Sequence, residues 1–425
     1  MSLDKRTKNR QGKGPRTWLV LLVLVASAAV LWVINSLSVA REIRVATGPP
    51  TPEQAAFFAD AADRPDLEAF FKGLKKAQQL AFARNTGKHD MPEAPRLIAK
   101  LLTTFDPDVR QQLTESLAAV AKTQPEATSQ ELKHGGNFQR LGVFRALREA
   151  GPDALPHVVA RLEQDDTRAN ALAFLVEAGE AATPHLLKAL SSQNKSARIA
   201  AADALGKIRS QVAVPGLIER YRTGEPDEKV SYLAALALIG HPATESMLTR
   251  TLLDTSQPVQ IRAHAALGLG RIGTGAAVRH LWSLVETYDL DFRSTVISAL
   301  RLAGDAALRH APADVQQRTL IQVAADVRSP AGDRVIQGAL QGPHALLAAG
   351  AAKERPSLAA SLLDLLKRSG GRDAELADAV IAALQTTPSG NEGLVALEDR
   401  PDLAGLIARR RKLQAEAQPT VGPRA

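Results

Sequence analysis

Seven basic residues recur through the middle of the chain at intervals of 28 to 33 residues. They are Arg110, Arg140, Arg168, Arg198, Lys229, Arg262 and Arg293. A guanidinium group is a rigid fork of five N–H donors. The series could therefore line a groove for an anionic ligand, or each side chain could bind acidic or carbonyl groups of a neighbouring turn inside the protein. Regular repetition favours the structural interpretation, and we name these residues the basic ladder.

Other residues that could perform chemistry do not form a recognisable catalytic pattern. His157 and His185 each follow a proline at matching points of the series, which favours packing over metal binding. No HxxxH or HExxH spacing, phosphate-binding loop or GxSxG motif occurs. The chain has no cysteine, which excludes disulfides and thiolate sites. The sequence therefore predicts no catalytic, metal-binding or cofactor-binding residue, and a protein that is not an enzyme.

The residues that follow each ladder position indicate how the ladder is held. Leucine lies seven positions later in all seven cases, and glycine lies eleven positions later in five. Two helical turns separate a ladder residue from its leucine, so both lie on one face, and the glycine suits a helix end. The position before the leucine is small in every case except Phe174, which lets helices approach closely. We expect about seven two-helix repeats over residues 95–310, each with its ladder residue near the start of the second helix.

This pattern resembles HEAT repeats, in particular the PBS-lyase HEAT-like group named after phycobilisome lyases. The match is carried by residues 196–206, by residues 261–273 and by the acidic-x-basic step of residues 108–110. The sequence departs from the pattern where Arg209 replaces glycine and where Lys229 replaces arginine. The resemblance implies an all-α solenoid. Because its relatives include bilin lyases, it also implies an alternative function, an enzyme or accessory subunit acting on a tetrapyrrole-bearing protein.

Residues 17–40 form an apolar run of twenty-four residues without a charge. About 20 such residues cross a bilayer as a helix, so we predict a single-pass signal anchor. Cleavage after Ala40, at a small-x-small site, is the alternative. Six basic residues precede the run, and the positive-inside rule places residues 1–16 in the cytoplasm as a basic tail. The rest of the chain would then be extracytoplasmic, in the periplasm if the membrane is a bacterial inner membrane.

The segments on either side of the repeats are less regular. Residues 41–94 contain a proline-rich spacer at 48–52 and five phenylalanines. They predict a juxtamembrane linker and a helical cap on the first repeat or, alternatively, an amphipathic segment resting on the bilayer. Residues 311–417 still have helical character, and we interpret them as degenerate repeats or a C-terminal cap. Residues 418–425 are expected to be a flexible tail.

The charge distribution argues against nucleic acid as a partner. The net charge is +8, but residues 1–16 contribute +5 and residues 409–425 contribute +4, so the middle is close to neutral. A duplex-binding protein needs a basic face, and none is indicated. The basic run 409–412 predicts a solvated helix end, with anionic polymer or lipid as the alternative ligand.

A solenoid usually binds its partners along one row of helices. We predict that the second helices supply this row, through small or apolar residues just after the ladder positions. These candidate protein-binding residues are Ala169, Ile199, Ser231, Ala263 and Ser294. The predicted function is a membrane-anchored extracytoplasmic scaffold that binds other envelope proteins.

Overall fold

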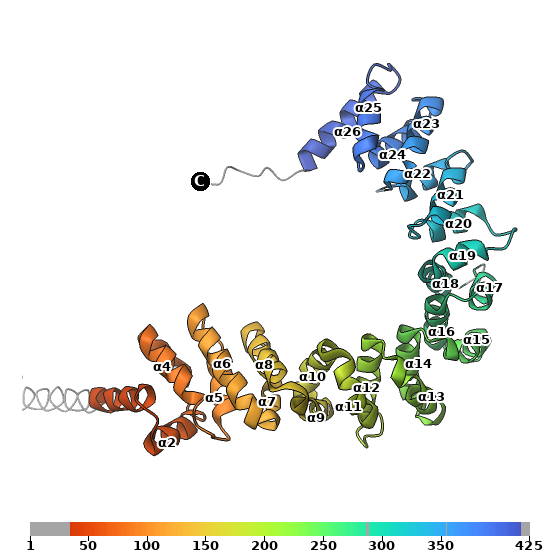
Figure 1. Cartoon of the computed structure of the whole chain (residues 1–425). Coiled ribbons are helices and arrows are strands. Elements are labelled where there is room, and N and C mark those ends of the chain that lie inside the picture. Colours follow the sequence, from red (N-terminus) through yellow and green to blue (C-terminus); the bar gives the residue numbers. More distant parts are fainter. Residues whose placement is uncertain (1–34, 286–288, 354, 418–425) are drawn as a thin grey trace, which may run out of the picture. The chain divides into compact units, whose positions relative to one another are not determined.

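The computed structural model describes residues 35–285, 289–353 and 355–417. Over these ranges the chain is all-α, with helices and turns and no strand. It divides into two compact units, Met1–His185 and Leu186–Ala425. In each unit, successive helical hairpins follow one another along the chain (Figure 1). The boundary between the units falls inside the predicted repeat region 95–310.

The ladder residues lie on seven helices that share one register. Each helix begins three residues before its ladder residue, and all but the first contain fourteen residues. They are α6 (Pro107–Thr123), α8 (Asn137–Ala150), α10 (Asp165–Ala178), α12 (Lys195–Ile208), α14 (Pro226–Ile239), α16 (Val259–Ile272) and α18 (Leu290–Ala303). In unit 1, α6 packs against α8. In unit 2, α12, α14, α16 and α18 pack one against the next as a row of second helices (Figure 1).

Shorter first helices complete the hairpins. They are α5 (Ala94–Leu101), α7 (Pro125–Gln130) and α9 (Leu155–Ala160) in unit 1, and α13 (Val214–Thr223), α15 (Glu245–Leu253) and α17 (Gly275–Trp282) in unit 2. The helix α11 (Thr183–Ala189) contains the unit boundary. Single 3₁₀ turns lead into or out of these helices at η1 (Glu131–Lys133), η2 (Gly151–Ala154), η3 (Arg161–Glu163), η4 (Gly179–Ala182), η5 (Gln211–Ala213) and η6 (Pro242–Thr244).

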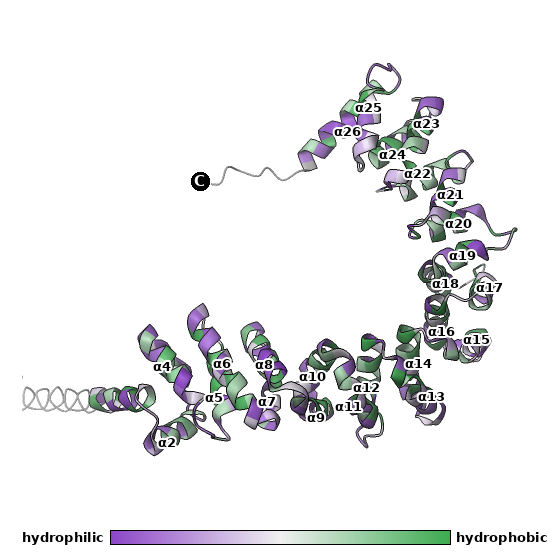
Figure 2. Cartoon of the chain, in the orientation of Figure 1, coloured by the Kyte–Doolittle hydropathy of each residue, from purple (hydrophilic) through white to green (hydrophobic). Residues whose placement is uncertain are grey.

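The leucines seven positions after the ladder residues form the centre of the core, as the spacing predicts. All seven have 0% exposure: Leu117, Leu147, Leu175, Leu205, Leu236, Leu269 and Leu300. The small residues beside them allow close packing of successive second helices. A Cβ atom added to Gly268 on α16 would lie 3.0 Å from the Cα of Ala237 on α14, the preceding second helix. Helices in both units carry apolar and polar residues on different sides (Figure 2).

The residues at the ends of the second helices confirm the predicted helix-stopping role of glycine. All five glycines at the eleventh position have φ between 59° and 79°. Gly240 and Gly273 adopt the left-handed helical conformation, whereas the other three combine positive φ with an extended ψ that glycine alone adopts easily. Arg209 takes the same left-handed conformation at φ 60°, the one positive φ outside glycine in the described part of the chain.

The first described residues, 35–47, form a helix that ends at the predicted spacer. Its last carbonyl groups are bound by buried amides. The Nε2 of Gln54 donates to the carbonyl oxygens of Val45 (2.7 Å), Ala46 (3.2 Å) and Gly48 (3.2 Å), and the Nδ2 of Asn85 donates to that of Gly48 (2.8 Å). The spacer is therefore packed against the structure that follows it. Most of the predicted anchor, residues 17–34, lies outside the described residues.

Helices α2 (Pro52–Ala61), α3 (Leu67–Gly73) and α4 (Lys76–Thr86) precede the first ladder helix, and α4 packs on α6. Phe58, Phe71 and Phe82 are at most 1% exposed and contact one another through Phe82, with ring centroids 5.0 and 5.3 Å apart. Phe57 and Phe70 are only partly exposed. These rings pack inside the helical cap, which favours the cap over an amphipathic segment on a bilayer. None of the helices found between residues 35 and 417 has both the length and the apolar character that a membrane span requires.

Residues 311–417 continue the alternation of helices. They contain α20 (Gln317–Ala324), α21 (Pro330–Ala339), α22 (Ala345–Ala351), η7 (Pro356–Leu358), α23 (Ala359–Ser369), α24 (Ala374–Leu384), α25 (Pro388–Val395) and α26 (Ala404–Ala417), after the short α19 (Asp305–Arg309). The alternate helices α18, α20, α22, α24 and α26 pack one on the other in that order. Arg355 is 5% exposed and donates to the carbonyls of Ala324 and Ala325, both at 2.7 Å, at the end of α20. The stacking therefore extends beyond the part of the sequence that shows the ladder pattern.

Candidate functional site

Four ladder side chains bind carbonyl groups of the turn before their own helix. Arg110, Arg168 and Arg198 donate to the carbonyls six and five residues earlier, with shorter distances of 3.0, 2.8 and 2.8 Å to Thr104, Leu162 and Ser192. Arg262 donates to the carbonyl of Leu252 at 2.9 Å across a longer turn. These guanidinium groups satisfy backbone acceptors that a helix end leaves free.

Three of these arginines also contact the next second helix. The guanidinium of Arg110 lies 4.0 Å from the ring centroid of Phe138, and that of Arg262 lies 4.4 Å from the ring of Phe292. Arg198 instead donates to the carboxylate of Glu228, at 2.9 Å from Nε and 2.5 Å from Nη2. One side chain thus connects its own turn to the neighbouring repeat.

The pair formed by Arg198 and Glu228 is largely buried. Glu228 is 2% exposed, and its second oxygen accepts from the hydroxyl of Tyr232 at 3.4 Å. The hydrogen bonds that Arg198 donates to Glu228 raise the pKa of Arg198 above its ordinary value. Burial, followed by the nearby Glu228 charge, raises the pKa of Tyr232. All three groups satisfy one another, so this cluster holds two repeats together.

The other ladder residues make different contacts. Arg140 donates to the side chain of Asn137 at 3.2 Å, and Arg293 donates to the hydroxyl of Thr319 at 3.4 Å. The side chain of Lys229 has no hydrogen-bonding or ionic partner among the residues that the structure describes. The ladder is therefore not one uniform element.

The five candidate binding residues lie on five successive second helices, from α10 to α18. Ala169 and Ser294 are exposed, and Ile199, Ser231 and Ala263 are partly exposed. The last four belong to unit 2, where their helices pack side by side. These side chains are accessible without being strongly apolar or charged.

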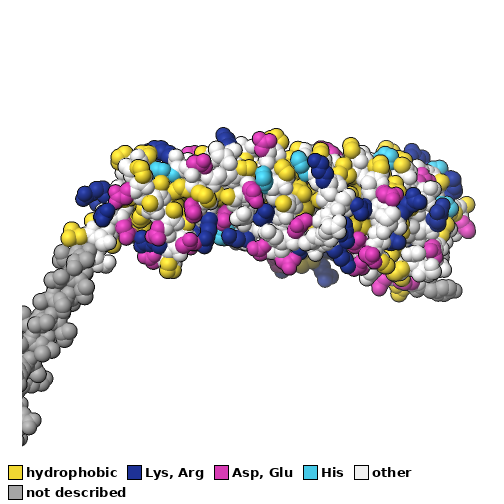
Figure 3. Space-filling view, turned by 90° about the horizontal axis from the view of Figure 1, so that it is seen from below, with side chains coloured by type: hydrophobic (Ala, Val, Ile, Leu, Met, Phe, Trp, Pro, Cys, Tyr) yellow, Lys and Arg dark blue, Asp and Glu magenta, His cyan; other side chains and the backbone are white. Residues whose placement is uncertain are grey.

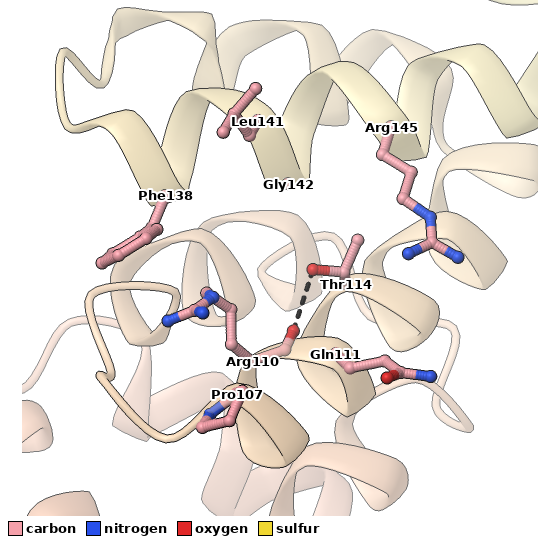
Figure 4. Close-up of a pocket in the computed structure, with 8 residues that line it drawn as sticks. All are labelled: Pro107, Arg110, Gln111, Thr114, Phe138, Leu141, Gly142 and Arg145. Carbon is pink, nitrogen blue, oxygen red and sulfur yellow. Dashed lines mark hydrogen bonds between the residues drawn. The ribbon is translucent and has the colours of Figure 1, made fainter. Parts of the chain in front are cut away.

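A more distinctive surface lies between α6 and α8 of unit 1 (Figure 4). It is a groove of about 250 Å³, which we call the α6–α8 groove. Its lining residues are Pro107, Arg110, Gln111, Thr114, Phe138, Leu141, Gly142 and Arg145. Leu141 is 61% exposed and Phe138 is 38% exposed. The nearby Phe105 is 86% exposed and meets Phe138 edge-on, with ring centroids 6.2 Å apart.

The groove contains two guanidinium groups and no carboxylate. Arg110 uses only Nη1 for hydrogen bonds, and Arg145 uses only Nε, which donates to Glu149 at 2.9 Å. Their remaining N–H groups have no acceptor within the described ranges. Nearby acidic groups are engaged: Asp108 accepts from Lys76 at 2.6 Å. In Figure 4, Arg110 lies on the α6 side of the groove and Arg145 extends from α8.

Phe138 and Leu141 were not among the residues that the sequence pattern selected. Leu141 follows Arg140 directly, which is the position of Ala169 and Ala263 in their repeats, and it is the one leucine at that position. Phe138 lies two residues before Arg140, where four of the seven repeats have aspartate. Comparing each repeat position across the series could have identified both.

Other parts of the surface are less informative. The described ranges contain no group of three or more acidic or histidine residues that could hold a metal ion. Within the basic run near the C-terminus, Arg410 is paired with Asp378 and Arg411 with Glu398, which favours a packed helix end over an anion site. On the face shown in Figure 3, basic and acidic side chains are interspersed.

Comparison with protein families identifies the repeats. Residues 152–238 and 224–301 match the family model of HEAT repeats. This part of the chain consists of HEAT repeats. The match begins after the α6–α8 groove, so the groove lies in hairpins that precede the matched HEAT repeats. No curated protein shows significant sequence similarity to the chain.

Several solved structures are similar in part. Human deoxyhypusine hydroxylase in complex with glycerol is 16% identical, with 65% of this chain and 99% of that chain covered and a TM-score of 0.26. The karyopherin Kap121p bound to the extreme C-terminus of the phosphatase Cdc14p is 12% identical, with 90% and 55% covered and a TM-score of 0.45. The CpcE–CpcF complex of phycocyanin lyase from Nostoc sp. PCC7120 is 20% identical, with 51% and 91% covered and a TM-score of 0.29. At these scores the similarities carry no conclusion about partners or activity.

Proposed function

We propose that this protein is a scaffold that binds other proteins through the second-helix row of its solenoid. The observation that carries the proposal is the exposure or partial exposure of apolar and guanidinium groups on the second helices α6 and α8 of unit 1, at Phe138, Leu141, Arg110 and Arg145, beside ladder contacts that hold the repeats together. Exposed aromatic and arginine side chains are the types that dominate protein–protein binding energy. A small-molecule enzyme would more often enclose its substrate in a largely apolar pocket.

The same proposal includes a single-pass anchor at residues 17–40, with residues 1–16 in the cytoplasm and the solenoid outside it, in the envelope of a bacterium. It rests on the apolar run and on the six basic residues before it. We further propose that the repeats are of the PBS-lyase HEAT-like type, on the motif residues 196–206 and 261–273. The partners would then be membrane or periplasmic proteins.

Topology is tested by fusing reporters after Ala425. A reporter that is active only outside the cytoplasm should be active, and one that is active only in the cytoplasm should be silent. The reverse pattern would refute the location and would favour the alternative function, a lyase-like role on a tetrapyrrole-bearing protein.

Binding along the row is tested by photo-crosslinking in the full-length chain. A photoreactive residue at Ile199 or Ser231 should form a discrete adduct with a partner protein, and the double variant Ala263→Glu with Ser294→Arg should abolish it. Val212 is 69% exposed and lies on η5, outside the row, so it serves as the control position. Equal adducts from Val212, or adducts lost only when residues 311–417 are removed, would place the binding surface elsewhere.

A further inference from the structure

We propose that the α6–α8 groove binds a segment of a partner protein that carries one aromatic or leucine side chain next to a carboxylate. This inference rests on the proposed scaffold function and names the chemistry of the ligand. Three features carry it: the size of the groove, its exposed apolar side chains and its unused arginine donors.

The size of the groove favours a peptide side chain over a small-molecule ligand. Its volume is about 250 Å³, whereas pockets for cofactors and drug-sized ligands typically measure about 300–1,000 Å³. The groove lies between two helices, α6 and α8 (Figure 4). One side chain from a polypeptide lying across the helices suits this shape.

The apolar contact is supplied by Leu141 and Phe138 on α8 and by the nearby Phe105. Their exposures are 61%, 38% and 86%, so water contacts apolar surface that a partner could cover. The ring of Phe138 is already oriented by Phe105 at its edge and by Arg110 over its face. A preoriented ring loses little conformational freedom when an aromatic or leucine side chain packs against it.

The carboxylate is inferred from the arginine donors. Arg110 retains Nε and Nη2, and Arg145 retains both Nη groups, without acceptors in the described part of the chain. Guanidinium groups bind carboxylates through paired N–H···O bonds. No carboxylate lines the groove, and Glu149 engages only the Nε of Arg145, so an acidic side chain of a partner complements the remaining guanidinium donors.

The segments of this chain beyond the described helices do not fit the same description. Residues 1–16 contain six basic residues and one acidic residue, and residues 418–425 contain one arginine and no acidic residue. Residues 1–16 would be repelled by two arginines, and residues 418–425 contain neither an aromatic residue nor a leucine. The occupant we propose is therefore a segment of another protein.

The test uses a phage-displayed library of random short peptides, selected on the full-length chain in detergent. Selected peptides should be enriched in an aromatic residue or leucine beside Asp or Glu. A consensus peptide with a fluorescent label should bind in a polarisation assay. Leu141→Asp and Arg145→Glu should each weaken this binding about tenfold or more, as expected for a central contact.

Leu290→Asp is the matched control, because Leu290 is an exposed leucine at 73% on α18 of the other unit and should not affect binding. Circular dichroism of each variant excludes unfolding. Peptides that are basic, or whose binding survives both groove variants, would overturn the groove assignment. If such peptides instead depend on Ala263 and Ser294, the scaffold proposal stands without the groove. If no peptide binds the chain on any face, and photo-crosslinking at the row also yields no adduct, both proposals fail.

Discussion

The α6–α8 and α16–α18 pairs contain the same contact in different surroundings. In each pair a ladder arginine lies over the ring of a phenylalanine on the next second helix, at 4.0 Å for Arg110 and Phe138 and at 4.4 Å for Arg262 and Phe292. Yet Phe292 is 2% exposed, whereas Phe138 is 38% exposed. One ring belongs to the core, and the other lines an open groove.

A shift of one residue explains the difference. Phe292 lies directly before its ladder residue, a position that is buried in six of the seven repeats, whereas Phe138 lies two residues before. That earlier position is usually exposed and has aspartate in four repeats: Asp108, Asp166, Asp227 and Asp291. One residue corresponds to about 100° around a helix, so the shift moves a ring from the core to the surface. Composition alone does not distinguish the two rings.

The largest expected effect comes from removing each ring in turn. Phe292→Ala should cost about 3–5 kcal/mol, as for a fully buried phenylalanine. Phe138→Ala should cost only about 1–2 kcal/mol, because part of its surface is already in water and a cation–π contact at an exposed site contributes about 0.5–1 kcal/mol.

The measurement is amide hydrogen exchange of α8 and α18, since each repeat of a solenoid contacts only its neighbours and opens locally. Unchanged exchange in the hairpins remote from each substitution is the internal control. Equal losses for the two variants would show that Phe138 is a core residue and that the groove is closed in solution.

The repeated part of the fold could be predicted from the sequence because its signals are local. Leucine at the seventh position and glycine at the eleventh position report burial and helix ends directly, and Leu205 and Gly240 behave as their types require. Arg209, recognised as a departure from glycine, does adopt the conformation that glycine would adopt.

The groove could not be predicted in the same way, because it depends on contacts between repeats. Nothing next to Arg110 in the sequence indicates that its donors stay open, since that follows from Phe138 on the next helix and from Lys76 engaging Asp108. Likewise, Leu362 lies seven positions after Arg355, but Leu366 takes the place of glycine or alanine at the eleventh, so the full ladder pattern does not select Arg355, although this side chain is buried and binds the end of α20. Long-range partners of this kind are visible only once the helices are placed.

A smaller effect tests what the two pairs share. Gly151 ends α8 and Gly304 ends α18, and a Cβ atom added to either would meet no atom within 4 Å. Replacing either by alanine should therefore cost only backbone strain, about 1–3 kcal/mol, and equally in the two pairs.

Arg209→Gly should have the opposite effect and raise the free energy of unfolding by about 1 kcal/mol, because a non-glycine residue already bears left-handed strain there. Urea titrations followed by hydrogen exchange of α8, α12 and α18 measure all three. Unequal glycine losses would mean that the repeats differ in more than their aromatic residues.

The smallest change in stability is expected from converting the groove position to the residue that other repeats use. Helix α8 has no acidic residue in its first turn, and Phe138 lies in that turn. Phe138→Asp should gain about 0.3–1 kcal/mol from the helix dipole and lose the packing and cation–π energy that Phe138→Ala also loses, about 1–2 kcal/mol, so the net loss should be about 1 kcal/mol. The same variant should nevertheless abolish binding of an acidic peptide to the groove, because it removes the ring and places a carboxylate beside Arg110. Melting curves and hydrogen exchange of residues 137–150 measure the first effect, and fluorescence polarisation measures the second.

A large loss of stability would show that the ring supports the fold. Retained binding together with an intact fold would show that the Phe138 ring neither supports the fold nor binds the peptide. Phe138 and Phe292 would then differ only in their exposure to solvent.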